Sequence, residues 1–149
     1  MAGALGDPAS DPTRGPRLCF HVRKDSSDTV SLIEVLTQLG AFYAGEQVVL
    51  LWDGLSAHWS HDLRAWLDTQ RAWLEVERLP GYAPELNPVE YLWANLKGVE
   101  LANFAGDTVV QVADTAERGI HRVCEDQQLV WSFLAHTGLT LDHKSPPNL

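Results

Sequence analysis

The sequence contains only two cysteines, Cys19 and Cys124. They stand far apart in the chain and form no Cys-x-x-Cys pair, so their spacing indicates neither a zinc site nor a disulfide. Free cysteine is most often a small hydrophobic core residue, and we expect that role for both.

Basic residues are also scarce. Lysine and arginine total 11 against 20 acidic residues, which gives a formal net charge of −9. Because affinity for a phosphate backbone is supplied mainly by Lys and Arg, this balance disfavours a chain that grips nucleic acid by itself. We expect only weak DNA binding from this chain alone.

Long hydrophobic runs are absent. The apolar run from Val48 to Trp52 is among the longest, and it is far shorter than the roughly 20 residues of a membrane-spanning helix. The N-terminal sequence lacks a basic segment followed by an apolar one, as a secretion signal requires. The sequence therefore predicts a cytoplasmic protein with no membrane contact.

The 149 residues are enough for one domain with a real core. Residues 1–16 are rich in Pro, Gly, Asp and Ala and lack hydrophobic periodicity, and the C-terminal end is similar. We expect disordered tails at 1–16 and 138–149, and a single domain over 17–137.

Hydrophobic periodicity within this domain alternates between strand and helix patterns. A continuous apolar strand over 47–53 is expected to be buried on both faces of a sheet, with Asp53 at its carboxyl end. The predicted order is strand, helix, strand, helix, strand, helix, helix. This is an α/β pattern in which helices cover a mostly parallel sheet. The expected strands are 17–22, 47–53 and 73–79. Four helices are expected: one that begins after Ser27 or Asp28, one from 60 to about 70, one that begins at Asn87, and one that begins after a cap at Asp107.

The segment LPGYAPELNPVEYLWANLK combines three prolines with the start of a helix. Pro80 and Pro84 favour a stiff loop, since proline fits neither a helix interior nor a central strand. Asn87 is the expected N-cap and Pro88 the first helical residue. Glu90 then lies in the first turn, where a carboxylate also suits the helix dipole, so by itself it has an ordinary structural explanation.

Asp53 by itself is equally ambiguous, because Asp-Gly after a strand is common turn chemistry. Together Asp53 and Glu90 are more informative. Ligands of open α/β sheets bind outside the carboxyl ends of the strands, and phosphoryl transfer on nucleic acid commonly uses carboxylates that hold two divalent ions. Mg²⁺ prefers such oxygen ligands and retains several waters.

Two segments resemble the second and third acidic motifs of DDE transposases of the mariner-type superfamily, in its bacterial insertion-sequence branch. They are VVLLWDGLSAHWS and, after it, LPGYAPELNPVEYLWANLK. The resemblance covers about Arg17 to Phe104. It implies an RNase H-like mixed sheet flanked by helices, and Mg²⁺- or Mn²⁺-dependent cutting and joining of DNA at transposon ends. Asp53 resembles the second catalytic acid and Glu90 the third, and both would be metal ligands.

Other residues also match the family's motif, each with an ordinary alternative. His58 could approach the metal site or a phosphate, or it could cap the helix that begins near Ser60. Lys97, seven positions after Glu90, shares its helix face and could meet a DNA phosphate, or it could be a solvated surface lysine. Trp52 and Trp93 lie on apolar stripes and are expected in the core.

The sequence departs from the family pattern at its beginning. Relatives carry a first catalytic Asp on an earlier strand, but Asp7 and Asp11 lie in the expected tail, and Asp25 and Asp28 follow the wrong strand. A helix-turn-helix DNA-binding region is not found either. We therefore expect an N-terminally truncated RNase H-like domain whose two-metal site is incomplete and inactive alone.

Three functions remain open at this point. The first is a transposase fragment whose site is completed by another chain. The second is a non-catalytic remnant that acts as a dimerising or inhibitory partner of a full-length transposase, pairing through the open edge of the 47–53 strand. The third is an unrelated metal-dependent phosphoesterase that uses Asp53, His58 and Glu90, which the long proline motif disfavours.

Overall fold

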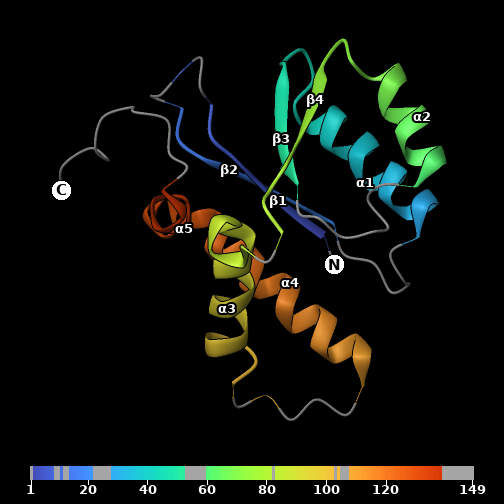
Figure 1. Ribbon diagram of the computed structural model, residues 1–149. Coiled ribbons are helices and arrows are strands. Elements are labelled where there is room, and N and C mark those ends of the chain that lie inside the picture. The colour runs from blue at the N-terminus through green and yellow to red at the C-terminus, as the bar shows by residue number, and fades with distance from the viewer. Residues whose placement is uncertain are drawn as a thin grey trace. The chain divides into compact units, whose positions relative to one another are not determined.

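The structure is a computed structural model that describes residues 2–8, 11, 14–21, 28–52, 60–81, 83–102, 104 and 108–138 (Figure 1). The chain divides into two compact units. The first comprises Met1–Ala2 and Arg23–Ala83, and the second comprises Gly3–Val22 and Pro84–Leu149. Each unit is described separately below.

The described part of the first unit contains two helices and two strands: α1 (Thr29–Phe42), β3 (Val48–Trp52), α2 (His61–Thr69) and β4 (Leu74–Arg78). Both helices begin at side-chain caps. Asp28 accepts a hydrogen bond from the Ser31 backbone N–H at 2.8 Å, and Ser60 accepts one from the Leu63 N–H at 3.3 Å. These caps satisfy backbone donors that the first turn leaves unpaired. The predicted order of elements in this region is confirmed.

Strands β3 and β4 pair in parallel, as predicted, with Val48 opposite Leu74 and Trp52 opposite Arg78. The pairing continues past the strand ends, because the Leu79 N–H donates to the Trp52 carbonyl at 2.8 Å. Helices α1 and α2 lie on the same side of the strand pair (Figure 1).

One prediction about β3 is wrong: the strand is not buried on both faces. Val49 is 61% exposed and Leu51 is 46% exposed. The parallel register places these residues opposite Glu75 and Glu77, which are also exposed. Because successive side chains of a strand point to opposite faces, one face of the pair combines valine and leucine with two carboxylates.

Among the described residues, the second unit contains two strands, a short 3₁₀ helix and three α-helices: β1 (Ala2–Gly6), β2 (Arg17–His21), η2 (Pro84–Leu86), α3 (Pro88–Val99), α4 (Val109–Glu125) and α5 (Gln127–Thr137). Strand β1 corrects the expectation of a tail without structure over 1–16. Its small residues allow close packing, since a Cβ at Gly3 would lie 3.3 Å from Cζ2 of Trp93. Leu5 packs against the hydrophobic core.

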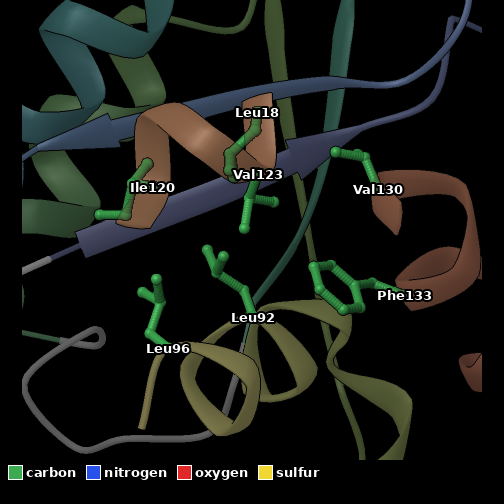
Figure 2. Close-up of a cluster of buried hydrophobic side chains, with 7 residues drawn as sticks. All are labelled: Leu18, Leu92, Leu96, Ile120, Val123, Val130 and Phe133. Carbon is green, nitrogen blue, oxygen red and sulfur yellow. The ribbon is translucent and has the colours of Figure 1, made fainter. Parts of the chain in front are cut away.

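The core of this unit lies between β2 and the three helices (Figure 2). Helix α3 contributes one face to it, with Leu92 fully buried and Leu96 2% exposed. Val99, the last residue of the helix, is exposed. The buried cluster consists of Leu18, Leu92, Leu96, Ile120, Val123, Val130 and Phe133.

The N-cap of helix α4 lies one residue later than predicted. The predicted cap, Asp107, lies outside the described residues. Thr108 is the N-cap and forms a capping box with Gln111, in which each side chain binds the other's backbone N–H at 3.3 Å. The buried residues of α4 all lie from Thr115 onward. Ile120 is completely buried, whereas Val109 is exposed.

Helices α4 and α5 meet at a single residue, which the sequence analysis did not predict. Asp126 ends α4 and caps α5, where its carboxylate accepts a hydrogen bond from the Leu129 N–H at 3.0 Å.

Helix α4 also packs closely on α3, because a Cβ at Gly119 would lie 2.6 Å from Cδ2 of Leu96.

The strands of the described part of the chain form two two-stranded sheets, β1–β2 and β3–β4, and not the single sheet expected. The α/β class itself is confirmed, since helices and strands alternate as predicted through α3. Among the described residues, no helix is long and apolar enough to span a membrane.

The difference between the two halves of α4 gives a stability prediction. Ile120→Ala should lower the free energy of unfolding by about 3 kcal/mol, because it removes a fully buried side chain and leaves a cavity. Val109→Ala on the same helix should change it by less than about 0.5 kcal/mol. Urea denaturation followed by circular dichroism measures both, and equal losses would contradict the packing described here.

Candidate functional site

Glu90 lies in the first turn of α3 and its side chain is exposed. Its carboxylate makes no hydrogen bond or ion pair with another described residue. Both oxygens are therefore available to an external ligand. The first turn of a helix also suits a negatively charged side chain, because it lies near the positive end of the helix dipole.

The local sequence holds the first turn of α3 in place. The Asn87 side chain accepts a hydrogen bond from the Val89 N–H at 3.1 Å, and Pro88 occupies the first helical position. The Asn87 N–H donates to the Pro84 carbonyl and the Glu90 N–H to the Asn87 carbonyl, each at 3.0 Å. Glu90 thus extends from a backbone that is hydrogen-bonded on both sides of the cap.

The proline segment ahead of α3 is irregular, apart from the single 3₁₀ turn η2 at Pro84–Leu86. Pro80 is exposed and follows Leu79, which is buried in the first unit. Helix η2 belongs to the second unit and leads directly into Asn87. The described residues before Asn87 thus form no α-helix and no strand after β4, as expected from the prolines, although Pro84 begins a 3₁₀ turn.

Two of the predicted site residues, Asp53 and His58, lie outside the described residues. Strand β3 ends at Trp52, so Asp53 directly follows that strand in the sequence. The cap of α2 is Ser60, and the alternative in which His58 caps this helix is therefore wrong. The metal-ligand and phosphate roles of the two residues stay predictions.

Lys97 is exposed in the last turn of α3. It lies seven positions after Glu90, which is about 10 Å along a helix axis and nearly two full turns. The two exposed side chains thus occupy opposite ends of one helix, the acid near the N-terminus and the base near the C-terminus. Each also suits the helix dipole at its own end.

The two tryptophans expected in the core are both half-buried. Trp93 packs at the edge of the core beside Gly3. Trp52 is the last residue of β3 and lies on the opposite face from Val49 and Leu51.

The described residues include no group of three or more His, Cys, Asp or Glu side chains that could hold a metal ion. The cysteines are not candidates. Burial raises the pKa of Cys19, with Cys124 nearby adding to the effect, and burial followed by the Glu125 charge raises the pKa of Cys124. Both therefore remain protonated thiols at neutral pH, which disfavours metal binding.

A polar network that the sequence analysis missed joins α3 and α4. Arg122 donates to Glu100 Oε1 at 2.6 Å through Nε and to Asn95 Oδ1 at 2.7 Å through Nη2. Glu100 is largely buried, with its side chain 12% exposed. No local pattern points to this network, because the partners belong to different helices.

Comparison with known families gives a decisive match. Residues 12–107 match the family described as DDE superfamily endonuclease. This range is more than half of the chain, and it includes Asp53, His58, Glu90 and Lys97. The chain belongs to the DDE superfamily endonucleases. Family membership confirms the RNase H-like α/β fold class predicted from the sequence.

Two solved structures of the Mos1 transposase catalytic domain, one with raltegravir and Mg and one with raltegravir and Mn, also resemble this DDE endonuclease. Their TM-scores are 0.48 and 0.45. In both cases the sequence identity is 20%, and the alignment covers 86% of this chain and 72% of the other. No curated protein matches the chain.

The cap of α3 can be tested by itself. Asn87→Ala should lower the free energy of unfolding by about 1 kcal/mol, since the Val89 N–H loses its partner. Asn87→Asp keeps an acceptor at the same position and should cost almost nothing. Thermal denaturation measures the two variants, and a similar loss for both would indicate that the side-chain cap is unimportant.

Proposed function

We propose that this chain is the catalytic part of a transposase that cuts DNA strands and transfers them at transposon ends, using divalent metal ions. The observation that carries the proposal is the family match over residues 12–107, because the matched range holds both Asp53 and Glu90. The order of the motifs around these acids supports membership of the bacterial insertion-sequence branch of the family. For a protein of this branch we propose a cytoplasmic location.

Glu90 fits the role of a metal ligand. It is exposed, has no protein partner among the described residues, and offers the hard oxygen atoms that Mg²⁺ and Mn²⁺ prefer. In the proposal Asp53 supplies a second carboxylate from the end of β3. Two bound ions would stabilise charge on the attacking and leaving oxygens of a phosphodiester.

The protein's own part in this reaction is to hold the acids and the DNA in position. The cap at Asn87 and the buried side chains of Leu92 and Leu96 fix α3, so Glu90 is presented in a defined direction. Lys97, at the other end of α3, would contact a phosphate of the bound DNA. His58 would do the same close to Asp53.

The proposal includes a limit on activity. Only two of the family's three acids are matched in this sequence, and the net charge of −9 weakens attraction to DNA. We propose that the chain alone does not cut DNA, and that a segment carrying a further carboxylate completes the site.

A second candidate function has its own supporting observation. Val49 and Leu51 are exposed on one face of the β3–β4 pair, beside Glu75 and Glu77. Such a surface would suit a non-catalytic role, in which the chain pairs with a second copy or with a full-length transposase. Mixing the chain with an active relative and measuring DNA cleavage distinguishes the roles, because a completed site adds activity and an inhibitory partner removes it.

The metal-ligand role gives a direct prediction. In titration calorimetry, Mn²⁺ should bind the chain mixed with a segment that supplies the first strands of a relative, and Glu90→Gln should abolish this binding. Glu85→Gln removes a nearby exposed carboxylate from η2 and should leave binding unchanged. If Glu90→Gln binds Mn²⁺ as well as the parent chain, Glu90 is not a ligand.

A further inference from the structure

Helices α1 and α2 both lie on one side of the β3–β4 pair and leave the other face of the pair exposed (Figure 1). Val49 is 61% exposed and Leu51 is 46% exposed, whereas the other residues of β3 are half-buried. The parallel register places these two residues opposite Glu75 and Glu77 of β4, which are also exposed. An apolar row and an acidic row thus lie side by side, about 4.8 Å apart. These four residues are called the mixed face below.

The charge of the acidic row is not balanced within the strands. Glu75 and Glu77 form no hydrogen bond or ion pair with other residues in the described part of the chain. Arg78 is the one basic residue of β3 and β4, and the alternation of side chains directs it to the opposite face. Two carboxylates two positions apart on a strand repel each other, so a cation beside them is favoured. The mixed face is therefore complementary to a surface that is both apolar and basic.

Charge distinguishes between the possible occupants of the mixed face. A DNA backbone would bring phosphates beside the two carboxylates, which is unfavourable. A second copy that presented the same face, as in a two-fold dimer, would bring four carboxylates together. An entirely apolar surface would bury Glu75 and Glu77 without partners, which is also costly. A basic protein surface has none of these costs.

We propose that the mixed face binds an amphipathic helix of a protein partner. Apolar side chains of this helix pack on Val49 and Leu51. Lysine or arginine side chains along the border of its apolar face pair with Glu75 and Glu77. The inference narrows the partner considered in the second candidate function, and its test is independent of metal binding and of DNA cleavage.

The dimensions of the mixed face suit a helix. Helices cover the faces of sheets in α/β folds, whereas an added strand would pair at a sheet edge. Residues 75 and 77 are about 6.6 Å apart along the strand. Basic residues at positions i and i+4 of a helix are about 6 Å apart along its axis, so one helix can pair with both carboxylates.

The probe is a fluorescein-labelled peptide of about 18 residues, long enough to form a helix, with leucines on one face and lysines along the border of that face. Fluorescence anisotropy with the full chain should show saturable binding. A peptide with glutamate in place of each lysine should bind at least about tenfold more weakly, because two ion pairs are lost. A peptide with the same residues in scrambled order should also bind more weakly, because it has no apolar face.

Variants test whether the peptide binds at the mixed face. Glu77→Gln should weaken binding up to about fivefold, as expected for one partly exposed ion pair. Val49→Thr should weaken it about fourfold, because it removes a methyl group that the peptide buries. Both variants should remain folded, since the two positions are exposed and threonine suits a strand. Glu85→Gln on η2 and Val109→Thr on α4 make the same changes at other exposed positions and should leave binding unchanged.

Several results would overturn the proposal. Absence of saturable binding, or equal binding of the scrambled peptide, would mean that the chain recognises no amphipathic helix. Equal binding of the glutamate peptide would mean that charge does not matter. Equal weakening by Glu77→Gln and Glu85→Gln would mean that the peptide binds the acidic surface in general. Equal weakening by Val49→Thr and Val109→Thr would mean that it binds any exposed apolar side chain.

Discussion

The burial of Leu92 and Leu96 between β2, α4 and α5 is the interaction on which the second unit depends. These two residues hold the inner face of α3, and the Asn87 cap fixes where the helix begins. Glu90 is exposed in the first turn of the same helix. Hydrophobic packing on one side of α3 thus determines where the carboxylate is presented on the other.

Local signals in the sequence predicted the elements well where a side chain binds its own backbone. Asp28, Ser60 and Asn87 each cap a helix at or next to the predicted position, because Ser, Asp and Asn accept hydrogen bonds from the first turn. The same rule led to the prediction that Asp107, and not Thr108, is the N-cap of α4. The actual cap is part of a box with Gln111, which depends on the residue three positions later.

Features that depend on distant packing could not be predicted in this way. The strand at Ala2–Gly6 has little β propensity and exists because its small residues fit against Trp93. The exposure of Val49 and Leu51 depends on which elements cover β3, and an apolar run alone does not contain that information. For the candidate site, the family resemblance identified Asp53 and Glu90, whereas the network of Arg122 with Glu100 and Asn95 joins residues that are far apart in the sequence.

The contact at Gly119 has a consequence for the two helices that meet there. The side chains of Leu96 and Glu100 come so close that a Cβ at this position would lie 2.6–2.8 Å from them. A larger residue would have to displace Leu96, which belongs to the buried cluster, and Glu100, which binds Arg122. One glycine of α4 thus connects the hydrophobic packing of α3 with the polar network that joins the two helices.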